Sequence, residues 1–153
     1  MAYTDTSAFC LQTDVEGLVQ RGVFTANTKP TAQQVLDWMA RYAGEIESTI
    51  AAVGSSYTVS ARNNPFPGSP SPAVARLKML CESANALGAA SQVVAMHSVL
   101  GGSGSTDAAT EMFERYTKLL EELVVAASNS VASAALVSRT DTTDLAFLTN
   151  TEF

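Results

Sequence analysis

The sequence is poor in charge, and the charge that it carries is mostly negative. Charged residues make up 16% of the 153 residues, and nine Lys and Arg against fifteen Asp and Glu give a formal net charge of −6. The basic residues are scattered along the chain and form no cluster. Because nucleic acids and anionic membrane surfaces are held by clustered Lys and Arg, a protein that grips either of them is disfavoured.

Residues that carry chemistry are also few. His97 is the only histidine, and the two cysteines, Cys10 and Cys81, lie far apart without a second metal ligand at short spacing. The glycine-rich stretch 101–105 lacks the Lys-Ser or Lys-Thr ending of a phosphate-binding loop. We therefore expect no catalytic residue, no cofactor and no metal site, and we predict that the chain is not an enzyme.

No apolar run approaches the roughly 20 residues that a membrane-spanning helix needs, so we expect no membrane partner. The length nevertheless suffices for one domain with a core of its own, since 46% of the residues are hydrophobic. Ala, Ser and Thr replace the missing charged residues. Such a surface suits burial against neighbouring subunits, and it equally suits an ordinary Ala-rich helical protein.

Two helices are indicated in the first third of the chain. Thr13 with Glu16 three residues later has the spacing of a capping box, which predicts a short helix over residues 14–20. Thr31 with Gln34 has the same spacing and predicts a second helix, which Gly54 ends. Its apolar residues recur at threes and fours, as expected of one buried face: Val35, Leu36, Met39, Ala43, Ile46, Ile50 and Val53.

Two longer helices follow. Ser71-Pro72 places a capping residue before a proline at the first helical position, and small residues over 86–90 would let another helix approach closely. A fourth helix is expected to begin at Ser105 or Thr106 and to end near Ala127. Its candidate buried residues are Ala109, Met112, Phe113, Tyr116, Leu119, Leu120 and Leu123. Residues 1–127 are thus predicted to form an all-α antiparallel bundle of about four helices.

Two segments do not fit the bundle. The proline-containing loop 55–71 carries Tyr57 and Phe66, which either contact a neighbouring protein or fold back on the bundle. Residues 128–153 are predicted to form an extended C-terminal arm, although residues 128–140 also fit a helix.

The end of the arm is polar except for large apolar residues that are costly to leave in water. We expect them to bind a partner, and the alternative is that they pack on their own bundle. These residues are Leu145, Phe147, Leu148 and Phe153.

The order of these features resembles the head–tail connector (adaptor) proteins of tailed bacteriophages. A short helix beginning Thr13-Asp14-Val15-Glu16 is followed by Phe24-Thr25-Ala26-Asn27-Thr28-Lys29-Pro30-Thr31 and an amphipathic helix ending Ile46-Glu47-Ser48-Thr49-Ile50-Ala51-Ala52-Val53-Gly54. Next come the segment Tyr57-Thr58-Val59 and a proline-rich loop, followed by a long helix with Asn85-Ala86-Leu87-Gly88-Ala89-Ala90. A glycine loop and a helix containing Tyr116 complete the pattern. The resemblance covers residues 13–123.

This resemblance implies a structural virion protein at the neck, made in the host cytoplasm. Such connectors form a ring, usually of twelve copies, beneath the portal protein. The ring extends the DNA channel without binding DNA specifically, and it docks a downstream neck or tail protein. The C-terminal segment commonly reaches onto the portal. Two alternatives stay open: another phage neck or tail-completion protein, and a stand-alone cytoplasmic helical-bundle binding protein.

Overall fold

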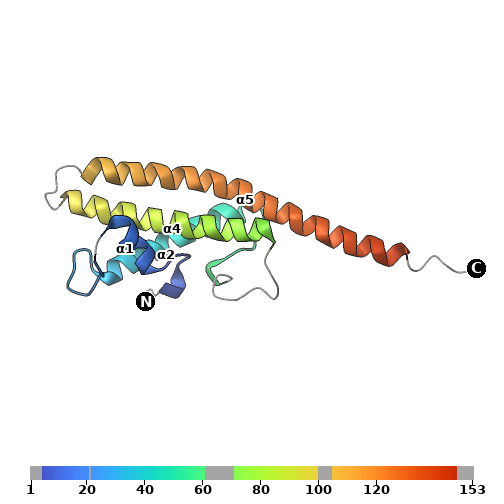
Figure 1. Cartoon of the computed structure of the whole chain (residues 1–153), viewed down its shortest axis with the longest axis horizontal. Helices are drawn as coiled ribbons and strands as arrows, with labels where there is room; N and C mark the ends of the chain where they lie inside the picture. The colour runs from blue at the N-terminus through green and yellow to red at the C-terminus, as the bar shows by residue number, and fades with distance from the viewer. Residues whose placement is uncertain (1–4, 21, 61–70, 100–104, 148–153) are drawn as a thin grey trace, which may run out of the picture.

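A computed structural model describes residues 5–20, 22–60, 71–99 and 105–147, and of residues 136–147 it describes the backbone alone. Within these ranges every regular element is helical, which confirms the predicted all-α class. The elements are a 3-10 turn η1 (Asp5–Ser7) and the α-helices α1 (Gln12–Val19), α2 (Ala32–Ala51), α4 (Pro72–Val99) and α5 (Ser105–Phe147). The helices α4 and α5 run antiparallel and side by side, with α2 beside α4 (Figure 1).

Helix α2 begins where the capping box predicts. The Thr31 hydroxyl accepts a hydrogen bond from the Gln34 backbone N–H at 3.3 Å, and the Gln34 side chain accepts one from the Thr31 N–H at 2.9 Å. These reciprocal bonds satisfy two backbone donors at the start of the helix. The chain leaves α2 through Gly54 at a φ of +83°, a conformation that favours glycine.

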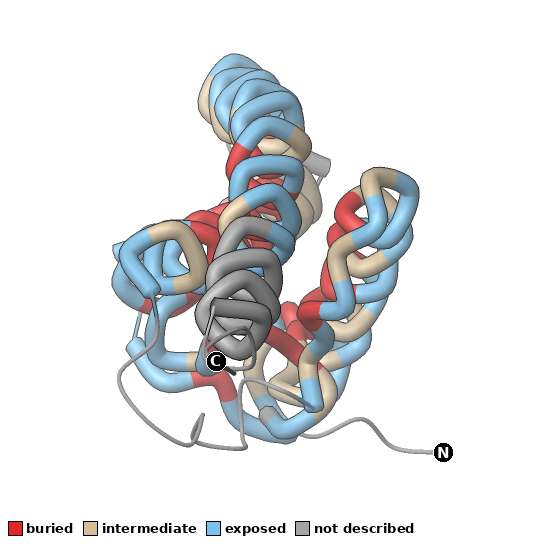
Figure 2. Tube along the Cα trace, turned by 90° about the vertical axis from the view of Figure 1, so that its right-hand side faces the viewer, coloured by how far each residue is buried: buried red, intermediate tan, exposed pale blue. Residues whose placement is uncertain are grey.

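The core lies where α2, α4 and the first part of α5 face one another, and buried residues line the inward faces of the helices (Figure 2). The predicted face of α2 is correct, because Val35, Met39, Ala43, Ile46 and Ile50 are all buried. Helix α4 contributes residues around most of its circumference. Its buried apolar residues are Leu77, Leu80, Cys81, Ala84, Ala86, Ala89, Ala90 and Val93.

Small residues let α2 approach α4 closely, as expected. The ring of Tyr42 from α2 lies over Gly88, where a Cβ atom would come within 2.7 Å of two ring carbons. The Tyr42 ring also packs against Tyr116 of α5 in a T-shaped arrangement, with ring centroids 5.0 Å apart. Tyr42 therefore joins all three long helices at one level of the core.

Helix α1 begins earlier than the capping-box prediction, which is wrong in its residues. The Asp14 carboxylate, and not the Glu16 carboxylate, closes the start of the helix by accepting from the Leu11 N–H at 2.8 Å. Glu16 is buried and accepts instead from the Phe24 N–H at 2.9 Å and from the Gln12 side chain at 2.8 Å. Its carboxylate ties the segment after α1 back onto that helix.

Helix α5 continues far beyond the predicted end near Ala127, to Phe147. Residues 128–147 are therefore helical and do not form an extended arm. The last buried residue described in α5 is Ser130, and most of residues 131–135 are exposed. Beyond this point α5 projects past the bundle as a continuous helix (Figure 1). We call residues 135–147, which follow the last α5 residue that lines a hollow with the bundle, the projecting segment.

Candidate interaction surfaces

The segment before α1 is fixed to the bundle through one buried amide. Asn85 of α4 is fully buried, and its side-chain oxygen accepts hydrogen bonds from the Phe9 N–H at 2.7 Å and the Cys10 N–H at 3.3 Å. Its amide nitrogen donates to the Met39 carbonyl of α2 at 2.8 Å. Because each partner would otherwise be a buried unpaired group, Asn85 is structural.

Tyr57 is buried, in contrast to the predicted interface at the loop tip. Its ring stacks on Phe9 with centroids 5.7 Å apart and an interplanar angle of 18°. Tyr57 thus folds back on the bundle, which was the alternative, and it is removed from the interface prediction. A contact between residues 48 positions apart leaves no local signal in the sequence, since nothing near Tyr57 distinguishes a buried ring from an exposed one.

The other predicted interface residues are not brought together by the described structure. Phe66, Leu148 and Phe153 lie outside the described residues. Leu145 and Phe147 belong to the last turns of α5, in the projecting segment. The prediction that these residues bind a partner therefore stays a prediction.

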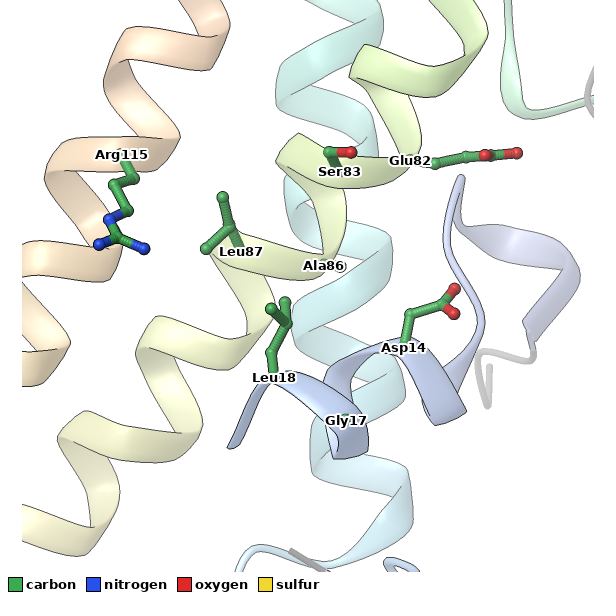
Figure 3. A pocket seen from close by; sticks show the side chains of 8 residues that line it. All are labelled: Asp14, Gly17, Leu18, Glu82, Ser83, Ala86, Leu87 and Arg115. Carbon is green, nitrogen blue, oxygen red and sulfur yellow. The ribbon is translucent and has the colours of Figure 1, made fainter. Parts of the chain in front are cut away.

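An open groove of about 580 Å³ lies between α1, α4 and α5 (Figure 3). Leu18 of α1 points toward α4, and Leu87 of α4 points toward the side on which α5 lies. Ala86 forms part of the floor of the groove. Leu18 is 40% exposed, although it lies about one helical turn after Val15, which is buried. The eight residues that line the groove are Asp14, Gly17, Leu18, Glu82, Ser83, Ala86, Leu87 and Arg115.

Charges of both signs border this groove. Arg115 of α5 lies on one side, and Asp14 and Glu82 lie on the other (Figure 3). Arg115 also pairs with Glu111 one turn earlier on α5, and Lys78 lies 3.9 Å from Glu82. These pairs are largely exposed and contribute little to stability, so the charged side chains remain able to exchange partners.

The apolar surface extends beyond the groove along α4. Met79 precedes Ser83 by one helical turn and is 59% exposed, which places it on the same face. An exposed methionine beside an open apolar floor is typical of surfaces that bind other proteins.

A second hollow, of about 270 Å³, lies where α5 leaves the bundle. Its walls are the turn after α2, the start of α4 and one face of α5, represented by Tyr57, Val74 and Val131. Val131 is 37% exposed. The exposed apolar surface therefore reaches the base of the projecting segment.

Two buried titratable groups lie in the core and not in either hollow. Burial raises the pKa of the Cys81 thiol to about 12, with a further contribution from the Glu82 and Glu47 carboxylates. Burial and the neighbouring Glu45 carboxylate also raise the pKa of the Tyr116 hydroxyl. Cys81 is thus a protonated core residue at neutral pH, as its apolar surroundings in the sequence indicate.

Among the residues that the structure describes, no group of three or more His, Cys, Asp or Glu side chains is placed to hold a metal ion. In the same part of the chain, no helix has the length and hydrophobicity required to span a bilayer. The comparisons with known proteins give no relative: no family model, no curated protein and no solved structure matches this chain.

Proposed function

We propose that this chain is a structural protein of a tailed-phage virion, a head–tail connector. In this proposal about twelve copies form a ring beneath the portal, extend the DNA channel and dock a neck or tail protein. The proposal rests on the order of helix starts that resembles connector proteins. It draws support from the correct positions of two of those starts, at Thr31 and at Pro72.

The observation that carries the proposal is the projecting segment. Because α5 is one continuous helix, this segment is held at a fixed angle by the packed first half of the same helix. At 1.5 Å per residue, residues 135–147 extend about 20 Å along the helix axis. A rigid extension of this length has no use within its own bundle. It suits a protein that spans the gap to a second body, which in a connector is the next subunit of the ring or the portal.

Electrostatics are consistent with a channel through which DNA passes. The net charge is −6 and the basic residues are dispersed, so the chain has few sites at which phosphates could displace counterions. A ring built from such subunits would repel the DNA backbone weakly and would not retain it.

The proposed role is one of assembly and involves no catalysis, cofactor or metal. Binding to portal separates it from its alternatives. Purified protein is mixed with procapsids or portal rings from the same phage, and sedimentation with cryo-EM then records whether density is added below the portal. A ring of added density at the portal is the expected result. Addition at another part of the neck or tail would indicate a different completion protein, and no binding to any virion component would favour a stand-alone binding protein.

A further inference from the structure

We propose that the groove between α1, α4 and α5 receives the projecting segment of a second copy of this chain. This inference supplies the subunit contact of the proposed ring and rests on that proposal. Two features of the described structure lead to it: a helix that leaves its bundle without a partner, and an open apolar groove that lies between helices.

Packing against a partner would stabilise the projecting segment. Seven of its thirteen residues are Ser, Thr, Asp or Val, which are weaker helix formers than Ala or Leu. Isolated helices of this length are marginal in water even when their sequence is rich in alanine. A helix over this sequence would gain stability from packing, and α5 extends here past the other helices of the same copy (Figure 1).

The groove has the character of a helix-binding surface. Leu18 and Leu87 both line the groove, and its floor includes Ala86, a small residue that lets a helix backbone approach. Met79 continues the apolar surface one turn further along α4. An amphipathic helix laid along such a surface buries its apolar side chains between the flanking helices.

The charges that border the groove are complementary to those of the projecting segment. The groove is bordered by Asp14 and Glu82 on one side and by Arg115 on the other. The sequence of the projecting segment contains one cation, Arg139, followed closely by two acidic residues, Asp141 and Asp144. A segment that carries both signs can satisfy both sides, whereas a purely basic or purely acidic partner would be repelled by one of them.

The occupant cannot be the segment of the same copy. Arg115 borders the groove, and residue 136 lies 21 positions later on the same helix, which is about 30 Å along its axis. Because α5 is continuous, it cannot fold back without breaking. The contact therefore joins two copies through different surfaces, and a head-to-tail contact of this kind closes into a ring when its rotation permits.

The first test measures self-association of the full-length chain by analytical ultracentrifugation. Leu18→Asp places a charge in the groove and should weaken self-association on the order of tenfold or more. Val23→Asp is the matched control, since Val23 is 69% exposed and does not line the groove. If Leu18→Asp does not fold by circular dichroism, Ser83→Arg, at an exposed position in the groove, gives the same measurement.

The second test identifies the occupant by cross-linking. A Ser83→Cys copy is mixed with a Ser138→Cys copy and treated with a short bismaleimide, while Cys10 and Cys81 are buried and do not compete. A cross-linked dimer that requires both variants is expected. A monomer at every concentration, equal association of Leu18→Asp and Val23→Asp, or no dimer in the mixture would overturn the inference.

Binding to portal is measured in parallel, so that the two proposals can fail separately. If the chain binds portal but its self-association does not depend on the groove, the proposed subunit contact is wrong and the connector role still stands. If self-association depends on the groove but the chain does not bind portal, the subunit contact stands and the connector role is wrong.

Discussion

At position 88 the absence of a side chain decides how closely two helices pack. Gly88→Ala would gain roughly 1 kcal/mol of helix propensity, but its Cβ would lie 2.7 Å from two carbons of the buried Tyr42 ring. We expect the overlap to dominate and the free energy of unfolding to fall by about 1–3 kcal/mol, measured by chemical denaturation. Gly44→Ala is the control, because Gly44 lies in α2 with no atom within 4 Å of its added Cβ. A Gly88→Ala protein as stable as the Gly44→Ala protein would contradict this packing.

The buried thiol of Cys81 makes stability depend on pH in the alkaline range. Its pKa rises from an ordinary 9.0 to about 12 on folding, so the unfolded chain loses this proton at lower pH than the folded chain. The corresponding stability is complete below pH 9.0 and is lost as the pH rises toward 12. Tyr116 acts in the same direction. Thermal melts at pH 8 to 11 should show falling stability, with a smaller fall in Cys81→Ala; an equal fall in both proteins would exclude the thiol.

At the scale of the helix, the sequence predicts starts better than ends. Thr31 and Pro72 mark starts correctly because the signal is local: a capping hydroxyl, and a proline that needs no N–H partner. Thr13 and Glu16 have the same spacing as Thr31 and Gln34. However, the Glu16 carboxylate accepts a hydrogen bond from the Phe24 N–H, and it is the Asp14 carboxylate that caps the helix by accepting from the Leu11 N–H. The spacing alone cannot reveal that competition.

The sequence also did not predict where α5 ends or where the groove lies, because both depend on tertiary packing. Ser and Thr are neutral to unfavourable in helices, so the composition after residue 128 suggests an ending that the chain does not follow. The groove depends on how α1 lies across α4, and helical periodicity assigns Leu18 to the buried face without information on that angle. The sequence therefore predicts which residues are apolar, whereas tertiary packing decides which of them remain exposed.

Within α4, neighbouring residues offer a direct test of the core. Leu80 is 7% exposed and belongs to the core, whereas Met79 beside it is 59% exposed. We expect Leu80→Ala to lower the free energy of unfolding by about 2–5 kcal/mol, from lost burial and the cavity left behind. Met79→Ala should change it by less than about 0.5 kcal/mol, as at other surface positions. Urea denaturation of both variants measures this difference, and equal effects would show that α4 is rotated from the position described.

At the scale of the whole molecule, net charge governs contact with DNA. With a formal charge of −6 and no basic cluster, the isolated protein should bind duplex DNA weakly or not at all at physiological salt. Gel-shift assays over a range of salt concentrations test this expectation. Tight binding that weakens steeply with salt would reveal a basic surface, and it would also argue against a channel that DNA passes without adhering.

The buried core and the C-terminal end of the chain can be tested separately. All the buried residues described lie between positions 8 and 130, so deleting residues 140–153 should leave the core intact. We expect the truncated protein to melt within a few degrees of the full-length chain, because changes outside the core rarely exceed about 0.5 kcal/mol.

Assembly should respond differently to the same deletion. It removes Leu145, Phe147, Leu148 and Phe153, and in full contact with a partner each such side chain would contribute roughly 1.5–3 kcal/mol. Around a ring these contributions combine through avidity, so their loss should abolish co-sedimentation with portal rather than weaken it slightly. A full-length chain with Leu145→Ser and Phe147→Ser is the matched control for chain length, and it should show most of the same loss. A truncated protein that still joins portal would show that the projecting segment is not the portal contact. One that fails to fold would show that residues 140–153 belong to the bundle.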